Sequence, residues 1–165
     1  MDPRIERADD RDLPEILRLV HRAYARNESL GFQFVGVSER PESLFVDWAA
    51  GHVFKLVDAD AIAGSIRMAS RHPEGRLDVW RLCVDPPLQR RGFGGRLLRF
   101  AEAEARRRSL GRIRLDTAKP FVELVGWYER QGYRVVGETR FPDVNYDSVI
   151  LEKPVDEGAA GIVRP

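Results

Sequence analysis

The sequence has few of the residues that build metal centres or disulfide frameworks. Its 165 residues include one cysteine and three histidines. A single cysteine excludes a disulfide framework and any multi-cysteine zinc site. Because His21, His52 and His72 are scattered without metal-ligand spacing, we expect no metal site. Lysine is also scarce, since 24 of the 27 basic residues are arginine. We attribute that bias to genomic base composition rather than to function.

Long apolar runs are absent as well. No hydrophobic stretch approaches the roughly 18 residues that a membrane span needs. Charged residues dominate positions 1–12, where a secretory signal would be apolar. We therefore expect a cytoplasmic protein with no membrane partner. With 43% hydrophobic and 32% charged residues, the composition is that of one globular domain. We place this domain at residues 1–155 and expect a flexible tail over 156–165.

The formal net charge of only +1 hides an uneven distribution. Residues 89–114 hold nine arginines and two glutamates, a net charge of +7, whereas the rest of the chain carries −6. This pattern excludes a uniformly basic surface but leaves room for one focused anion site. The acidic remainder is compatible with a cationic amine. The arginines at 106–108 lack interleaved aromatic residues and any recognition motif, so we expect no nucleic-acid partner.

Hydrophobic periodicity predicts an alternation of helices and strands. Helices are expected over 12–26, 41–50, 96–109 and 120–131. Strands are expected over 5–7, 52–57, 62–69, 77–84, 113–116, 133–141 and 148–153. Turn residues at 58–61 and 72–75 make 52–84 an antiparallel meander. The chain therefore reads as a mixed α/β protein.

Residues 89–95, Gln-Arg-Arg-Gly-Phe-Gly-Gly, form a basic, glycine-rich segment between a strand and a long helix. Backbone N–H groups at a helix N-terminus lack intrahelical partners and lie at the positive end of the helix dipole. Glycines let that backbone approach an anion, and Arg90 and Arg91 can add charge-assisted hydrogen bonds. The Gly-Lys-Ser/Thr ending of a P-loop is missing, and the spacing is not that of a Rossmann fingerprint. The segment therefore predicts a phosphate site of another kind.

Together with its flanking segments, this loop resembles the GNAT superfamily of N-acetyltransferases. The resemblance rests on the strand at 78–84, Asp85-Pro86, the loop at 89–94, the following helix, and Trp-Tyr-Glu-Arg-Gln-Gly-Tyr at 127–133. It covers about residues 3–155. It implies an α/β (α+β) fold, with a mostly antiparallel sheet of six or seven strands, about four flanking helices and a splay between strands four and five. It also implies acetyl transfer from acetyl-coenzyme A to a primary amine, by direct attack in a ternary complex.

The resemblance assigns the cofactor mainly to the backbone. Pantetheine would lie along the fourth strand, and the pyrophosphate would sit on the amides of the glycine-rich loop. The asparagine that the family often has after strand five is absent from 117–120, which leaves Lys119 as a candidate phosphate contact. The implied cofactor residues are Leu82, Cys83, Val84, Gln89, Arg90, Arg91, Gly92, Phe93, Gly94, Gly95 and Lys119.

Two residues receive catalytic roles from the resemblance. Tyr128 would be the general acid toward the coenzyme A sulfur, unless it only closes the core beside Trp127. Asp78 would be the base, directly or through water, unless it is a strand carboxylate that is solvated or paired with Arg81. We interpret Cys83 as a small core residue rather than a nucleophile.

The acceptor side is expected in the loop at 27–37 and the turn at 142–146. A small-molecule amine is the expected acceptor, with a protein or peptide amine as the other candidate. A non-catalytic acyl-coenzyme A-binding module is the alternative function, and a homodimer is compatible with the family. The candidate acceptor residues, of which the aromatic ones could instead be packing residues, are Phe32, Phe34, Trp80, Asp143, Asn145 and Tyr146.

Overall fold

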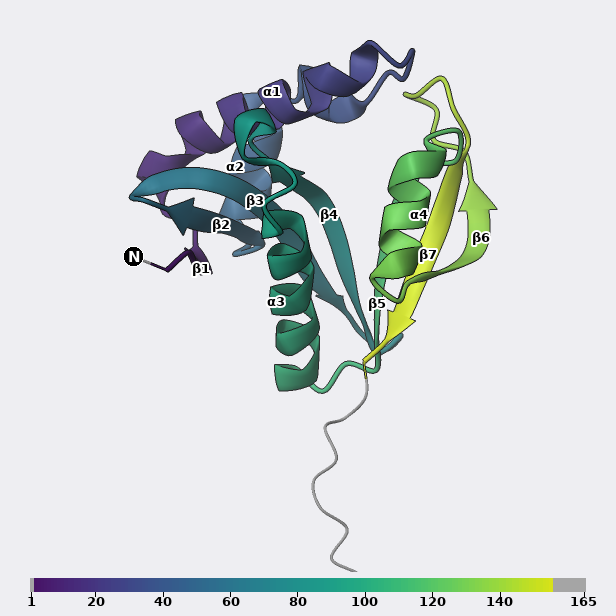
Figure 1. The fold of residues 1–165 in the computed structure, drawn as a ribbon. Helices are drawn as coiled ribbons and strands as arrows, with labels where there is room; N and C mark the ends of the chain where they lie inside the picture. The colour runs from purple at the N-terminus through teal and green to yellow at the C-terminus, as the bar shows by residue number, and fades with distance from the viewer. Residues whose placement is uncertain (1, 156–165) are drawn as a thin grey trace, which may run out of the picture.

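The computed structural model describes residues 2–155, so the tail expected at 156–165 lies outside the described residues. Every helix and strand expected from the sequence is present (Figure 1). The helices are α1 (Leu13–Glu28), α2 (Pro41–Ala49), α3 (Phe93–Arg107) and α4 (Val122–Arg130). The strands are β1 (Arg4–Arg7), β2 (Val53–Asp58), β3 (Ala61–Arg71), β4 (Arg76–Val84), β5 (Arg112–Ala118), β6 (Arg134–Thr139) and β7 (Ser148–Pro154). Short 3₁₀ turns are η1 (Asp10–Asp12), η2 (Val35–Ser38) and η3 (Pro86–Leu88).

The strands form one seven-stranded sheet in the order β1-β2-β3-β4-β5-β7-β6. Neighbouring strands are antiparallel except β4 and β5, which are parallel. The β4–β5 pairing runs only from Arg76 opposite Arg112 to Asp78 opposite Arg114. Beyond that point the two strands diverge and leave a wedge in the sheet (Figure 1). The expected mixed sheet and its splay between the fourth and fifth strands are therefore confirmed.

Helices cover both faces of the sheet and bury a core on each. The apolar positions of α1 follow helical spacing, as expected for a helix with one buried face. With α2 it covers one face, whereas α3 and α4 pack on the other (Figure 1). The first core contains Ile16, Leu19, Val20, Leu44 and Cys83, and the second contains Leu97, Leu98, Ala101, Ile113 and Tyr128. Among the described residues, no helix is long and apolar enough to cross a membrane.

A bulge interrupts β4 at the start of the wedge. Arg67 of β3 lies opposite Trp80, and Ser65 lies opposite Cys83, so two residues of β4 share one position of β3. One of them, Arg81, has a φ of +49°, in the left-handed region that non-glycine residues seldom occupy. Bulges of this kind re-aim a side chain and increase local twist. Here the re-aimed side chain is that of Arg81.

Helix α3 begins at Phe93, three residues before the expected start. Gly92 precedes it with a φ of +82°, so the chain enters the helix through a conformation that suits glycine. The glycine-rich pattern favoured a loop up to residue 95, but Phe93 is buried and extends the helix. A Cβ on Gly94 would lie 3.3 Å from the Trp127 ring, so this glycine permits a close approach between α3 and α4.

Candidate active site

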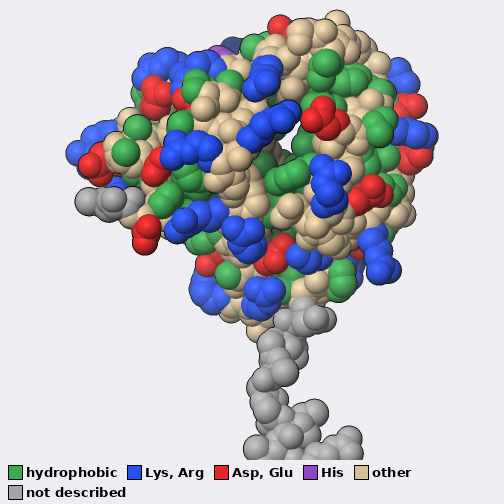
Figure 2. Space-filling view, in the orientation of Figure 1, with side chains coloured by type: hydrophobic (Ala, Val, Ile, Leu, Met, Phe, Trp, Pro, Cys, Tyr) green, Lys and Arg blue, Asp and Glu red, His purple; other side chains and the backbone are tan. Residues whose placement is uncertain are grey.

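A cavity of about 590 Å³ occupies the wedge between β4 and β5. Its walls include residues 79–84 of β4, residues 115–117 of β5, and the side of α4 that carries Tyr128. The start of α3 and the loops at 34–35 and 141–146 complete the lining. In the space-filling view an opening lies between the two halves of the molecule, with basic side chains beside it (Figure 2). Its volume is typical of a site for a small molecule or cofactor.

The start of α3 provides the anion-binding part of the cavity. The first helical hydrogen bond runs from the Arg96 amide to the Gly92 carbonyl, at 3.0 Å. The amides of residues 93–95 therefore precede the hydrogen-bond ladder and have no intrahelical acceptor. No atom lies within 4 Å of the place where Gly92 would carry a Cβ. A phosphate can approach these amides and the positive end of the helix dipole.

The two loop arginines differ in position. Arg90 lines the cavity, is highly exposed, and has only a 4.0 Å ion pair with Glu123. Arg91 is absent from the cavity wall: it stacks over the Phe93 ring at 5.2 Å and forms a 3.7 Å ion pair with Asp58. Arg90 is thus the arginine placed to meet a phosphate.

The side chains of two other expected cofactor residues, Gln89 and Lys119, already have partners within the protein. The Gln89 side chain donates a hydrogen bond to the Val84 carbonyl at 3.2 Å and accepts one from Arg26 at 3.0 Å, which fastens the loop to β4 and α1. Lys119 forms a 2.7 Å ion pair with Glu138 and does not line the cavity. The structure therefore does not bring Lys119 to the phosphate end.

The edge of β4 that faces β5 is unpaired from Val79 to Val84 among the described strands. Leu82, Cys83 and Val84 line the cavity along this edge. Free backbone N–H and C=O groups on a strand edge can pair with an extended chain that carries amides. The Cys83 thiol itself is buried, and burial raises its pKa to about 12, so it is a poor nucleophile. In the part of the chain that the structure describes, no group of three or more His, Cys, Asp or Glu side chains could hold a metal ion.

Tyr128 lies in the cavity wall with its ring packed between two other aromatic rings. Trp127 is 4.9 Å and Tyr133 is 6.0 Å from it, measured between ring centroids. Burial, and to a smaller extent the nearby Tyr24, Tyr133 and Asp116, raises the pKa of Tyr128 well above its usual range. The phenol therefore keeps its proton at neutral pH, as a proton or hydrogen-bond donor must.

Asp78 is held at the closed end of the wedge. It is the last β4 residue paired with β5, and it forms 2.8 Å ion pairs with both Arg71 and Arg76. It is absent from the lining of the cavity that contains Tyr128. The structure therefore does not bring the two expected catalytic residues together.

Asp116 lines the cavity together with Tyr128, and Asp143 is the other carboxylate in the lining. Asp116 lies on β5 just beyond the point where β5 leaves β4. Desolvation raises the pKa of Asp116, an effect that Arg81 partly opposes and Asp78 adds to. No role for Asp116 was expected from the sequence. Its signal was the single carboxylate of a strand that otherwise carries only arginine as a charged residue.

The expected acceptor residues divide into two groups. Phe34, Trp80, Asp143 and Tyr146 line the cavity, whereas Phe32 and Asn145 do not. The Asn145 side chain instead joins two loops: it accepts a hydrogen bond from the Gln33 amide and donates one to the Gly31 carbonyl, both at 3.0 Å. The Phe32 ring stacks on that of Phe121 at 5.6 Å and lies 6.1 Å from that of Tyr146. These contacts hold the loop before η2 against the loop before β7.

A comparison with known protein families identifies the architecture. The model of the acetyltransferase (GNAT) family matches residues 14–133. This chain belongs to the GNAT family of acetyltransferases. It is an acetyl-coenzyme A-dependent N-acetyltransferase, and the unpaired β4 edge and free amides of α3 fit acetyl-coenzyme A as its donor.

Individual relatives agree with this assignment. The acetyltransferase is 28% identical over 145 residues to the S-(2-succino)cysteine N-acetyltransferase of Bacillus subtilis strain 168, covering 84% of this chain and 88% of the relative. Among solved structures it resembles the PaiA N-acetyltransferase of Thermoplasma acidophilum in complex with coenzyme A, with a TM-score of 0.78, 16% identity, and coverage of 93% and 99%. It also resembles the ribosomal-protein-S18-alanine N-acetyltransferase of Escherichia coli, with a TM-score of 0.76, 19% identity, and coverage of 94% and 95%. At these identities the solved structures establish the shared fold alone.

Proposed function

We propose that this acetyltransferase transfers the acetyl group directly to the primary amine of a small molecule while donor and acceptor occupy the cavity together. The observation that carries the proposal is that one cavity contains the free amides of α3, the unpaired β4 edge and Tyr128. An acetylated cysteine intermediate is disfavoured because Cys83 is buried and its pKa is raised to about 12.

Donor binding is proposed to use the main chain for the most part. The amides of residues 93–95 and the Arg90 side chain would hold the pyrophosphate. The β4 edge at Leu82, Cys83 and Val84 would pair with the amides of the pantetheine arm. When bound, acetyl-coenzyme A supplies an activated thioester carbonyl with a thiolate as leaving group. An N–H group of the unpaired β4 edge would donate a hydrogen bond to the carbonyl oxygen.

Asp116 and Tyr128 are proposed to move the two protons of the reaction. The acceptor ammonium must lose a proton before attack, and Asp116 accepts it directly or through water. The new C–N bond then forms as the C–S bond breaks, and the Tyr128 hydroxyl gives its proton to the departing sulfur. The nitrogen loses its second proton as the amide forms, and that proton returns to Tyr128 through water. We assign the base to Asp116 rather than Asp78, because two arginines hold Asp78 outside the cavity.

A small-molecule acceptor is favoured over a protein amine on two grounds. The relative from Bacillus subtilis carries the name of an enzyme that acts on a modified amino acid. In this chain, moreover, Asn145 and the aromatic rings around Phe32 tie two loops together beside the cavity. Loops that are tied together leave less room for a folded protein substrate.

The test measures binding and turnover separately. Acetyl-coenzyme A should raise the melting temperature, and a panel of small amines should include one that releases free thiol and yields the acetylated amine. Stabilisation without turnover on any amine would instead support the non-catalytic acyl-coenzyme A-binding module. Absence of stabilisation at millimolar acetyl-coenzyme A would overturn the donor assignment.

Removal of the proposed acid gives a sharper test of the mechanism. Tyr128→Phe should lower kcat by about 10²-fold, as is typical for loss of a general acid, while the KM for acetyl-coenzyme A changes less than about twofold. Tyr133→Phe is the matched control, because Tyr133 is buried against Tyr128 but does not line the cavity. A loss of acetyl-coenzyme A affinity in Tyr128→Phe, or equal losses of kcat in both variants, would show that Tyr128 is structural.

A further inference from the structure

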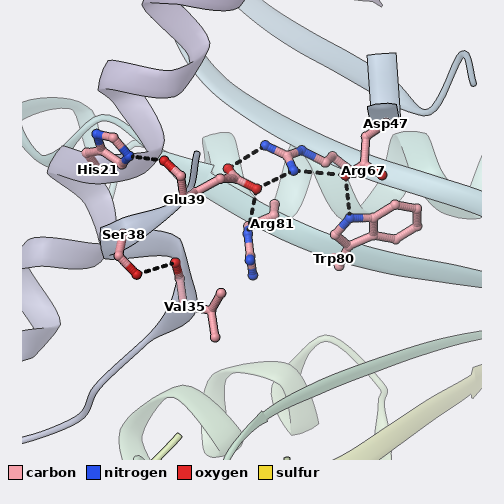
Figure 3. Close-up of polar contacts among 8 residues, drawn as sticks. All are labelled: His21, Val35, Ser38, Glu39, Asp47, Arg67, Trp80 and Arg81. Atoms are coloured by element: carbon pink, nitrogen blue, oxygen red, sulfur yellow. Dashed lines mark hydrogen bonds and ion pairs between the residues drawn. The ribbon is translucent and has the colours of Figure 1, made fainter. Parts of the chain in front are cut away.

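A buried cluster of charged side chains lies next to the cavity-lining residues Trp80 and Arg81, and no step of the proposed reaction uses it. Arg67 and Glu39 have side chains only 1% exposed and form two parallel hydrogen bonds of 2.7 Å. Arg67 also donates to Asp47 at 2.9 Å, and the Trp80 indole donates to Asp47 at 3.1 Å (Figure 3). One arginine and two carboxylates leave this cluster with a net charge of −1.

Arg81 joins the cluster through its Nε group alone. Its Nε donates to Glu39 at 3.4 Å, a long bond to an oxygen that already accepts from Arg67. The guanidinium carbon lies 5.9 Å from the centroid of the Tyr24 ring. In Figure 3 the rest of the guanidinium points away from the Arg67–Glu39 pair. Among the described residues neither Nη group has a hydrogen-bond partner, and Arg81 lines the cavity.

The backbone conformation at Arg81 also indicates that its side chain is directed into the cavity. Arg81 occupies the β4 bulge at a φ of +49°, a conformation with an energetic cost that surrounding structure must offset. The bulge directs its side chain into the wedge, where an arginine with a purely structural role would be expected to make closer contacts. A guanidinium held at its Nε edge presents its two Nη groups as a planar fork, which matches a carboxylate in a bidentate pair.

The charged residues around the two Nη groups of Arg81 indicate which chemical class of ligand the cavity can bind. Arg81 and Asp116 both line the cavity, and the positive charge of Arg81 lowers the pKa of Asp116, so one cavity offers a positive and a negative group. Asp143 and Arg90 are the other charged residues in the lining. An α-amino acid carries the complementary pair of charges, an ammonium and a carboxylate on adjacent carbons. A dianionic group at the fork would be repelled by Asp116.

We propose that the acceptor is an amine that carries a carboxylate beside it, as in an α-amino acid, with the carboxylate bound by the two Nη groups of Arg81 and the amine facing Asp116. This inference rests on the proposed function. It adds the chemical class of the acceptor and the residue that selects it.

The experiment compares amino acids with the same amino acids as α-carboxamides, which keep the amine and side chain but lack the negative charge. For acceptors that the wild-type protein acetylates, the carboxylate form should exceed the amide in kcat/KM by about 10- to 100-fold, the range for a charge-assisted pair. In Arg81→Gln this preference should fall below about threefold, while the KM for acetyl-coenzyme A stays within about twofold. Arg81→Lys should recover only part of it, because an ammonium lacks the planar fork.

Arg108→Gln is the matched control. Its side chain is 22% exposed, as is that of Arg81, and it pairs with Glu104 at the far end of α3 from the phosphate loop. It should leave the preference for carboxylate unchanged. Equal losses on carboxylates and amides in Arg81→Gln, or a wild-type preference for the amides, would overturn the proposal.

A binding measurement separates this inference from the proposed function. Calorimetric titration of the amino acids into the coenzyme A-loaded protein needs no turnover. If no amine is acetylated but amino acids bind the wild-type protein and not Arg81→Gln, the proposed function fails and the assignment of Arg81 stands. If amines without a carboxylate are acetylated and amino acids neither bind nor react, the assignment of Arg81 fails and the proposed function stands.

Discussion

At the scale of single residues, Tyr128 is buried and Asp116 is exposed toward the cavity, yet desolvation acts on both with opposite chemical consequences. Desolvation raises both pKa values, because a low-dielectric wall disfavours a phenolate and a carboxylate alike. For the phenol, a raised pKa keeps the proton that the leaving sulfur needs. For the carboxylate, a raised pKa makes the ionised form a stronger base at neutral pH. One cavity wall can therefore supply both an acid and a base.

The raised pKa of Asp116 predicts the acid side of the pH profile. As pH falls through that pKa, which lies above the ordinary value of 3.8, the base becomes protonated and kcat/KM should fall. Asp116→Asn should lower kcat by about 10²-fold and remove this inflection. Asp78→Asn is the comparison, since it changes a carboxylate outside the cavity. The measurement is kcat/KM from pH 4 to 9 for the wild type and both variants. An inflection that is lost in Asp78→Asn and kept in Asp116→Asn would show that Asp78 is the base.

The sequence predicted residue positions only where the relevant contacts are local. Tyr128 and the glycine-rich segment before α3 follow from motifs. Asp116 and Asp78 both lie on neighbouring strands, and only the point at which β4 leaves β5 decides which of them faces the cavity. Lys119 was expected at a phosphate because of its place after β5, yet it pairs with Glu138 of β6, a strand whose position the sequence does not reveal.

At the scale of elements, the buried charges link β3 to the segment between η2 and α2. Glu39 lies just before α2, and its carboxylate accepts two hydrogen bonds from Arg67 of β3. Isolated ions this deeply buried are unfavourable, so each partner stabilises the other in place. The sequence predicted a strand over 62–69 and a helix over 41–50 but gave no indication that Arg67 is fully buried.

Removal of one partner should therefore be costly. Arg67→Met leaves Glu39 buried with only the long 3.4 Å ion pair to Arg81 and should lower the free energy of unfolding by about 3–5 kcal/mol. Urea denaturation at neutral pH measures the change. Arg71→Met, whose ion pair with Asp78 is half exposed, should cost less than about 1 kcal/mol. Equal effects in the two variants would show that the buried cluster contributes no special stability.

The two loops joined by Asn145 form the second linked element. Asn145→Ala removes both 3.0 Å hydrogen bonds to the loop at 31–33 and should raise the KM for the acceptor several-fold, with that for acetyl-coenzyme A unchanged. Ser29→Ala, which removes a hydrogen bond from the Ser29 hydroxyl to the Arg26 carbonyl at the end of α1, is the control. Steady-state kinetics with each substrate varied would test this, and a rise confined to the acetyl-coenzyme A KM would contradict it. The sequence predicted an acceptor role for Asn145 from its place in the turn at 142–146. It could not show the loop contact, because the hydrogen-bonded residues are 112 positions apart and meet only in the folded chain.

At the scale of the whole molecule, fewer basic side chains reach the cavity than the charge of the sequence suggests. Of the arginines between 89 and 114, only Arg90 lines the cavity. The arginines at the end of α3 pair with Glu102 and Glu104, and those of β5 pair with Glu152. Most arginines of this segment are thus held in ion pairs, two of whose partners, Glu102 and Glu104, are already counted in its net charge of +7. The anion site depends on helix amides and one side chain. The mixed sheet and its wedge were predicted only through the family resemblance, because strand periodicity does not specify partners.

The central claim is that acetyl transfer takes place directly between two molecules held in one cavity. Initial velocities measured with acetyl-coenzyme A and an accepted amine both varied test it most directly, together with the intact mass of the protein after incubation with acetyl-coenzyme A alone. The structure predicts intersecting double-reciprocal lines and an unmodified protein, because the Cys83 thiol is buried and protonated. Parallel lines together with an acetylated protein would contradict it.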